Sequence, residues 1–196
     1  MDDVDAETTY EVEIKLRADH ERVRERLTSF AAERAGTVEQ VDTYYEAPHR
    51  SFAETDEALR IREERLDGDI HEERTADDAT YRLTYKGPKV DAASKTREEH
   101  ETGIVDPDAT DATLRALGFS PAATVRKTRE RYHLDDYTIT LDSVDGLGAF
   151  VEVEREAAGD EVGSARDGAH EILDRLGFDP DAQLRTSYLE LLVREG

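Results

Sequence analysis

Strict alternation of apolar and polar residues recurs along this chain and predicts β-strands. In Tyr10–Arg17, Val12, Ile14 and Leu16 fall on one face, and every residue between them is charged. A repeat of two is that of a strand whose two faces meet different surroundings. The full set of predicted strands is Tyr10–Arg17, Val41–Ala47, Ala58–Glu64, Thr80–Lys86 (ended by Gly87-Pro88), Thr96–Val105, Val125–Leu134, Tyr137–Val144 and Phe150–Glu156.

Helical spacing of apolar residues predicts helices between and after these strands. Asp19 is suited to cap a first helix, which we expect to run to about Ala35 and to stop at Gly36. Its buried side is predicted to carry Val23, Leu27, Phe30 and Ala31. The other predicted helices are Pro107–Leu117 and Asp160–Leu176, and the short apolar segment Ser187–Val193 fits a helix or a strand, of which we favour the helix.

Two stretches, Leu66–Ala79 and Lys89–Ser94, are polar and unpatterned, and we expect both to be flexible. No change of composition marks a linker, so residues 1–196 are expected to form one domain with a core of about 8–194. With about eight strands and three or four helices, the predicted fold class is α+β.

Charge narrows the function classes that remain. The 196 residues include 48 Asp and Glu against 26 Lys and Arg, for a formal charge of -22. Nucleic acids and anionic membranes carry the same sign, so neither is an expected partner. The acidic N-terminus is unlike a signal peptide, no apolar run reaches the ~20 residues of a membrane span, and cysteine is absent. We therefore expect a cytoplasmic protein.

The basic residues are 21 Arg and only 5 Lys. An acidic, lysine-poor surface is what we expect of a protein that works in concentrated salt, where screening removes the cost of self-repulsion. On that interpretation most acidic residues serve solvation, and the informative charges are those that depart from the pattern.

Charged residues spaced by two share one face on strand after strand. The sets are Glu11, Glu13 and Lys15; Arg60 and Arg62; Arg82 and Lys86; Arg97, Glu99 and Glu101; Lys127, Arg129 and Arg131; and Glu152, Glu154 and Glu156. The opposite faces are mostly apolar and are expected to pack against the helices.

A flat sheet with a solvated charged face is one interpretation. On a protein of charge -22 such a face should be mainly acidic, yet Val125–Arg131 holds four basic residues. Two like charges ~4 Å apart repel by about 1 kcal/mol in water and about 4 kcal/mol at an effective dielectric constant of 20. Cations on facing strands are therefore favourable only around an anion. We predict a closed or nearly closed antiparallel barrel with a charged tunnel.

The acidic strands supply two carboxylate pairs, Glu11 with Glu13 and Glu152 with Glu154. All-oxygen ligation suits Mg²⁺ or Mn²⁺. Basic groups for phosphate oxygens together with carboxylates for a divalent cation are typical of phosphoryl chemistry. The phosphate-loop motif GxxxxGK[ST] is absent, so side chains must bind any phosphates.

These residues resemble the CYTH superfamily, the triphosphate tunnel metalloenzymes. Glu11–Lys15 reads ExExK, as in that family's signature. Further motifs follow in the family's order over nearly the whole chain: DTYYEAP, ALRIR, YKGP, REEHE, VRKTRERY, LDSVDGLGAFVEVE and SYLELL. The details are most similar to the class IV adenylyl cyclase branch, with the thiamine triphosphatase and tripolyphosphatase branches close behind.

The resemblance implies an eight-stranded antiparallel β-barrel, the triphosphate tunnel, with helices outside. It implies that Glu11, Glu13, Glu152 and Glu154 hold Mg²⁺ or Mn²⁺, and that Glu99 and Asp142 are supporting acidic residues. The residues that it implies for triphosphate binding are Lys15, Arg60, Arg62, Lys86, Arg97, Lys127 and Arg129, of which Lys15, Arg60, Lys127 and Arg129 are expected to be catalytic. Arg126 falls on the opposite face from Lys127, and Arg131 is expected at the tunnel mouth. Tyr44 and Tyr188 are expected to pack, and no role is assigned to the histidines.

Three functions are compatible with this site. A cyclase would convert ATP to cyclic AMP and pyrophosphate, and the resemblance places it first. A triphosphatase would hydrolyse tripolyphosphate, thiamine triphosphate or a nucleoside triphosphate in the same tunnel. A non-catalytic nucleotide or polyphosphate sensor is the third. ATP or another triphosphate is the expected partner, and a homodimer is compatible with the sequence.

Overall fold

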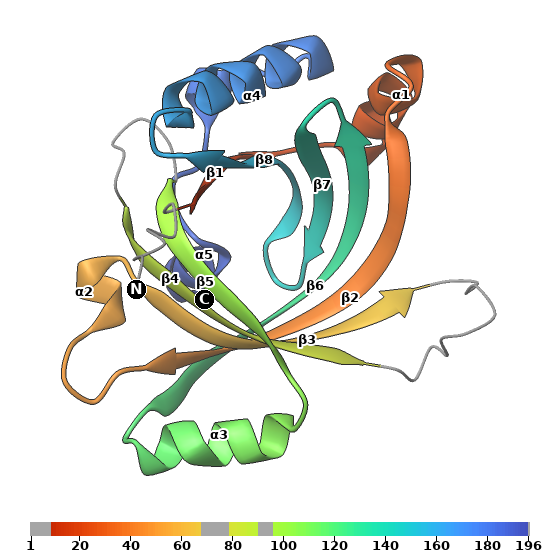
Figure 1. Cartoon of the computed structure of the whole chain (residues 1–196). Coiled ribbons are helices and arrows are strands. Elements are labelled where there is room, and N and C mark those ends of the chain that lie inside the picture. The colour runs from red at the N-terminus through yellow and green to blue at the C-terminus, as the bar shows by residue number, and fades with distance from the viewer. Residues whose placement is uncertain (1–8, 68–78, 90–95, 196) are drawn as a thin grey trace, which may run out of the picture.

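Eight antiparallel strands close into a barrel in the order β1-β5-β4-β3-β2-β6-β7-β8. The computed structural model describes residues 9–67, 79–89 and 96–195, and Figure 1 shows the strands curving around one central space. The strands are β1 (Thr9–Arg17), β2 (Glu33–Glu46), β3 (Ala58–Asp67), β4 (Thr80–Lys89), β5 (Arg97–Ile104), β6 (Ser120–Leu134), β7 (Tyr137–Val144) and β8 (Gly148–Ala158). The predicted fold, a single α+β domain built on an eight-stranded barrel, is confirmed.

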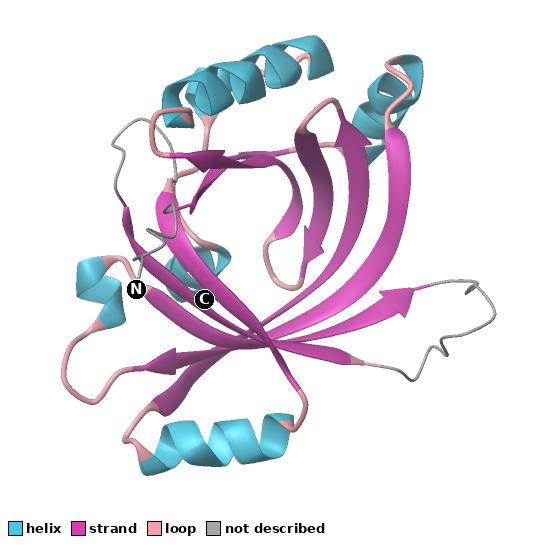
Figure 2. Cartoon of the chain, viewed as in Figure 1, coloured by secondary structure: helices cyan, strands magenta, loops and turns pink. Residues whose placement is uncertain are grey.

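Most helices lie outside this barrel, as Figure 2 shows, whereas the last one packs against Val125, Val144 and Phe150. The helices are α1 (His20–Ser29), α2 (Phe52–Thr55), α3 (Pro107–Ala116), α4 (Val162–Leu176), the 3₁₀ helix η1 (Pro180–Ala182) and α5 (Tyr188–Glu195). The sequence had not indicated α2 or η1. Within the described residues, no helix is long and apolar enough to cross a membrane.

Over most of the barrel, the period-two patterns place charged residues inside and apolar residues outside. On β1, Ile14 and Leu16 join the main apolar core with α1 and α4, while Lys15 between them points inward. On the opposite side of the barrel, Leu59 of β3 and Leu114 of α3 belong to a second core. Apolar burial against helices therefore fixes the register that turns the charged faces inward.

The prediction that the first helix runs to Ala35 is wrong. The helix ends at Ser29, and Ala31 takes a left-handed conformation with φ of 55°. Ala31 is also exposed, contrary to the prediction that it is buried. Residues Glu33–Glu46 instead form β2, which pairs with β6 along its length and with β3 from Thr37 to Tyr45. Pairing with β6 outweighs the helical propensity of Glu33 and Arg34, the first residues of this strand.

Strands β1, β2, β3, β4, β6 and β8 are longer than predicted, β1 by one residue. Gly87-Pro88 does not end β4, which continues to Lys89 through a register shift between Lys86 and Lys89. Proline lacks a backbone N–H, so it is tolerated where the ladder is already irregular. Most of the two stretches expected to be flexible, residues 68–78 and 90–94, lies outside the described residues; Leu66 and Asp67 end β3.

Strand β1 closes the barrel unequally on its two sides. With β8 it is paired from Thr9↔Ala158 to Arg17↔Phe150. With β5, the described pairs are Tyr10↔Glu98 and Glu11↔Arg97. Farther along, the Leu184 N–H, in the segment before α5, donates to the Lys15 carbonyl at 2.7 Å. We call the junction of β1 with β5 the seam.

Two glycines of α4 predict opposite effects of the same substitution. A Cβ at Gly168 would lie 2.1 Å from the oxygen of the Tyr137 hydroxyl, whose O–H donates to the Ala165 carbonyl. A Cβ at Gly163 would meet nothing within 4 Å. We expect Gly168→Ala to lower the free energy of unfolding by about 1–2 kcal/mol through overpacking. Gly163→Ala should raise it by up to about 1 kcal/mol through helix propensity.

Urea denaturation of both variants at one fixed, high KCl concentration measures the two effects. Equal stability of Gly168→Ala and the unsubstituted chain would contradict the packing of α4 on β7.

Candidate functional site

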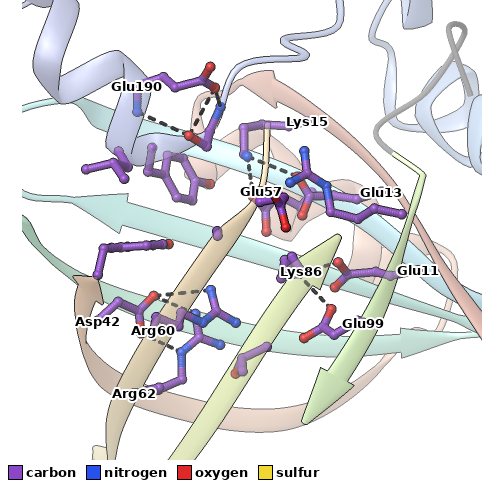
Figure 3. Close-up of a pocket in the computed structure, with 18 of the residues that line it drawn as sticks. Glu11, Glu13, Lys15, Asp42, Glu57, Arg60, Arg62, Lys86, Glu99 and Glu190 are labelled. Atoms are coloured by element: carbon purple, nitrogen blue, oxygen red, sulfur yellow. Dashed lines mark hydrogen bonds and ion pairs between the residues drawn. The ribbon is translucent and has the colours of Figure 1, made fainter. Parts of the chain in front are cut away.

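The barrel encloses a cavity of about 890 Å³, which we call the tunnel. Charged side chains from seven strands line it, and Figure 3 shows part of this lining. Of the predicted site residues, Glu11, Glu13, Lys15, Arg60, Arg62, Lys86, Arg97, Glu99, Lys127, Arg129, Glu152 and Glu154 line the tunnel. Asp142 lies behind this lining and is fully buried.

Three carboxylates converge where β1 meets β8. Glu13 pairs directly with Glu154 in the ladder, and Glu11 lies two residues away on the same face. One oxygen from each of the three lies within 4.8 Å of the others. Burial raises the pKa of Glu154 to about 7, and the nearby Glu11, Glu152 and Glu13 add to the rise. Crowded, partly buried oxygens of this kind fit a hard divalent cation such as Mg²⁺ or Mn²⁺, which would offset their mutual repulsion.

Glu152 differs from the other three predicted metal ligands. It lies 2.9 Å from Lys15 and also forms an ion pair with Arg129, and it is outside the group of three converging carboxylates. The two-residue spacing from Glu154 puts both side chains inside the barrel, but it does not give them the same neighbours. Glu152 lies between two cations, so it is placed to orient basic side chains.

Lys15 is the most buried cation of the tunnel, with 1% of its surface exposed. Its Nζ lies 3.0 Å from Glu13 and 2.9 Å from Glu152. Burial works against its charge, but these two carboxylates raise the pKa of Lys15 above its usual range. Lys15 therefore stays protonated beside the three converging carboxylates.

A second group of charges centres on Asp42 of β2, which the sequence analysis did not single out. Arg62 donates two hydrogen bonds of 2.6 Å to its two oxygens, and Arg60 donates one of 3.4 Å (Figure 3). Burial disfavours the carboxylate, but Arg60 and Arg62 hold the pKa of Asp42 below its usual range. The signal was present in the sequence, because Asp42 shares the face of Tyr44 within the DTYYEAP segment.

A third group centres on Asp142 of β7. Lys127 donates to it at 3.0 Å, and Arg129 donates to both of its oxygens at 2.7 and 2.6 Å. Burial and the neighbouring Arg129 and Arg62 lower the pKa of Lys127 to about 8, although Asp142 and Glu152 act in the opposite direction. Lys127 is therefore the tunnel cation that loses its proton most readily.

The fourth group lies at the seam. Lys86 of β4 bridges Glu11 of β1 and Glu99 of β5, with 2.8 Å to Glu99 (Figure 3). Arg97 donates to the carbonyl and carboxylate of Asp56, at 2.9 and 3.3 Å, and so fixes the turn after α2.

Two arginines carry buried N–H groups without an acceptor. In the part of the chain that the structure describes, neither Arg60 Nε nor Arg97 Nε has a hydrogen-bond partner. A buried donor left unsatisfied costs about 1–3 kcal/mol. Both residues line the tunnel, so an anion inside it could accept from these groups.

Other predictions have mixed outcomes. Arg126 is exposed, as its parity predicts, and Arg131 lines the tunnel and pairs with Glu64 at 2.6 Å. Tyr44 packs in an apolar cluster at one end of the barrel interior. Tyr188 packs in the same cluster but also donates from its hydroxyl to Asp142 at 3.0 Å. Packing alone was an incomplete prediction for Tyr188.

Comparison with known proteins identifies the family to which this tunnel belongs. The CYTH domain matches residues 9–188. A protein of Methanocaldococcus jannaschii named "Putative adenylate cyclase" is 38% identical over 183 residues, which is 92% of this chain and 97% of that protein. Adenylate cyclase CyaB of Aeromonas hydrophila is 25% identical over 162 residues, 80% of this chain and 73% of that protein.

Among solved structures, a protein of Pyrococcus horikoshii is 40% identical and superposes with a TM-score of 0.84, covering 95% of this chain and 99% of that one. The CYTH domain match, over residues 9–188, extends from the first described strand to the start of the last helix. It includes all four groups of charged residues described above. The chain is a member of the CYTH family.

Proposed function

We propose that the tunnel binds a triphosphate together with a divalent cation. The observation that carries the proposal is the pair of buried N–H groups of Arg60 and Arg97, which have no acceptor among the described residues and lie in a tunnel that also holds three converging carboxylates. Phosphate oxygens would satisfy these donors, and side chains can bind them bidentately. The proposed phosphate-binding residues are Lys15, Arg60, Arg62, Lys86, Arg97, Lys127 and Arg129.

Glu11, Glu13 and Glu154 would hold the cation, and Glu152 would orient Lys15 and Arg129. A divalent cation at this site would activate an attacking oxygen and neutralise charge on the phosphates. The side chains then have separate tasks. Lys15 and Lys127 stabilise charge that develops on the reacting phosphates, while Asp42 and Asp142 hold the arginines in place.

The reaction that we propose is cyclisation of ATP to cyclic AMP and pyrophosphate. The ribose 3′-oxygen forms a bond to the α-phosphorus, the bond from that phosphorus to the β-phosphate bridging oxygen breaks, and the 3′-hydroxyl proton is released. Both curated relatives described above carry adenylate cyclase in their names. The tunnel lining also includes apolar side chains from α2, β3 and β6, namely Phe52, Ala53, Ala58, Ala122 and Ala123, which could seat an organic group beside Arg60.

Phosphorus NMR of the purified protein tests this reaction. ATP and tripolyphosphate are supplied separately with Mg²⁺ or Mn²⁺ in molar KCl, because the acidic composition predicts a protein that works in concentrated salt. Pyrophosphate and a cyclic phosphodiester signal from ATP are expected. Release of orthophosphate from either substrate, without a cyclic product, would show that the protein is a triphosphatase and not a cyclase. Binding of ATP without turnover would indicate a sensor.

Substitution of Glu154 tests the carboxylate site. Glu154→Gln keeps the size of the side chain but removes one anionic oxygen ligand, so we expect metal-dependent turnover to fall by at least about 100-fold. Glu171→Gln, the same change at an exposed position of α4, is the matched control and should retain full turnover. Initial rates over a Mg²⁺ titration measure both. Undiminished activity of Glu154→Gln would remove this residue from the site.

The lowered pKa of Lys127 predicts a pH dependence of triphosphate binding. Below about pH 8 Lys127 is protonated and attracts phosphate; above it the side chain becomes neutral. Affinity should therefore fall as pH rises through 8, by up to about tenfold per pH unit. In Lys127→Arg the charge persists at all these pH values, so this loss should be absent.

Isothermal titration calorimetry with magnesium tripolyphosphate from pH 7 to 9.5 measures the difference between the two proteins. Because both titrate the same ligand, its own ionisation cancels in the comparison. Parallel pH profiles would exclude Lys127 as the titrating group.

A further inference from the structure

Tyr188, the first residue of α5, lies against two of the tunnel's lysines. The Lys15 Nζ is 4.1 Å from the centre of its ring, and the Lys127 Nζ is 5.1 Å from it. The two lysines come from β1 and β6, which are not neighbours in the barrel. Tyr188 is 6% exposed, so these contacts are made largely away from solvent.

The hydroxyl of the same side chain reaches a third member of the site. It donates to Asp142 Oδ2 at 3.0 Å, the oxygen that also accepts from Lys127 at 3.0 Å. One tyrosine therefore contacts two cations through its ring and the carboxylate partner of one of them through its hydroxyl. Phe150 packs against this ring in a T-shaped arrangement, with 5.0 Å between the ring centres, and supports it in this position.

Docking of α5 fixes where this tyrosine lies. Ser187 and Glu190 form a reciprocal cap: the Ser187 N–H donates to Glu190 Oε2 at 2.7 Å, and the Glu190 N–H donates to Ser187 Oγ at 3.1 Å. Leu191, one turn later, is buried in the apolar cluster with Phe150. Just before the helix, Leu184 donates to the Lys15 carbonyl at 2.7 Å. The chain around α5 thus holds both the backbone and the ammonium group of Lys15.

The contacts of Tyr188 bear on the electrostatics of the two lysines. Two buried ammonium groups around one site repel each other, and each is also drawn toward carboxylates that would turn it away from a ligand. The face of an aromatic ring attracts cations without adding a full negative charge or an oxygen that competes with phosphate for the metal. A tyrosine can therefore hold both lysines in the tunnel while leaving their donors available.

We propose that Tyr188 is a positioning residue that sets the Lys15 and Lys127 ammonium groups for the triphosphate. The proposal rests on the proposed triphosphate binding. Tyr188 touches no reacting atom in this scheme; it acts through the two lysines and Asp142.

Three variants separate the ring from the hydroxyl and from packing. Tyr188→Leu keeps an apolar side chain on α5 and removes the ring. Tyr188→Phe keeps the ring and removes the hydroxyl. Leu191→Ala weakens the apolar packing of the same helix without touching either lysine. Calorimetry with magnesium tripolyphosphate gives the dissociation constant for each, and steady-state rates give KM and kcat.

We expect Tyr188→Leu to raise the dissociation constant and KM by about tenfold or more, since two desolvated cation–π contacts are lost. Tyr188→Phe should recover most of that loss, and Leu191→Ala should change KM by less than about threefold while lowering thermal stability. Equal KM values for Tyr188→Leu and Leu191→Ala would reduce Tyr188 to a packing residue and overturn the proposal. If the unsubstituted chain binds no tripolyphosphate, the proposed function fails instead.

A second measurement uses the unsubstituted protein, so its result does not depend on whether a variant folds. The chain has five lysines, so ¹³C-lysine labelling gives few signals to assign. The side-chain protons of Lys15 and Lys127 should show upfield ring-current shifts in the unsubstituted protein, and both should move on addition of magnesium tripolyphosphate. Signals of these two lysines at the positions of solvent-exposed lysines would contradict the geometry on which the proposal depends.

Discussion

Pairing of buried charges is the constraint on which the rest of this structure depends. Lys15, Asp142 and Glu152 are each at most 2% exposed, and an isolated ion at such a position would cost several kcal/mol. Each charge is instead shared along a chain of contacts that crosses four strands, β1, β8, β6 and β7. Its members, in order, are Glu13, Lys15, Glu152, Arg129, Asp142 and Lys127. This chain of contacts requires β1 to lie beside β8, so the pairing of these two strands and the neutralisation of the barrel interior depend on each other.

Such a network makes ligand binding an exchange of partners. Most tunnel cations already contact a carboxylate, so a triphosphate must share or displace those contacts, and its affinity is the difference between two large terms. Carboxylates freed in this way are drawn toward a divalent cation. The alternation of positive and negative side chains along the tunnel therefore favours a ligand that combines anionic oxygens with a metal. It disfavours an anion or a cation that binds alone.

The period of two was sufficient to predict which residues enter the tunnel, because burial of Val12, Ile14 and Leu16 on one face of β1 leaves Glu11, Glu13 and Lys15 nowhere else to point. The period of two could not predict which of the inward-facing side chains contact one another. Glu152 contacts Lys15 and Arg129, whereas Glu154 lies with Glu11 and Glu13. This difference depends on the geometry of the barrel and on Arg129 of another strand, and no local sequence pattern encodes it. The same holds for the first helix, whose predicted end failed because Glu33–Glu46 pairs with strands remote in sequence. Asp42 and Tyr188 lay within recognisable segments, but their partners became evident only in three dimensions.

The seam between β1 and β5 makes the resistance of the barrel to local opening differ around its circumference. The described backbone ladder there is short, and the side chain of Lys86 spans it by contacting Glu11 on one strand and Glu99 on the other. A cylinder closed along one line by side chains opens first along that line, so amide hydrogens of β5 should exchange through local opening before those of β8. Any ligand that contacts residues on both sides adds its binding free energy to closure. Occupancy of the tunnel and integrity of the cylinder are thereby thermodynamically linked, and we expect a filled tunnel to make the protein more resistant to proteolysis.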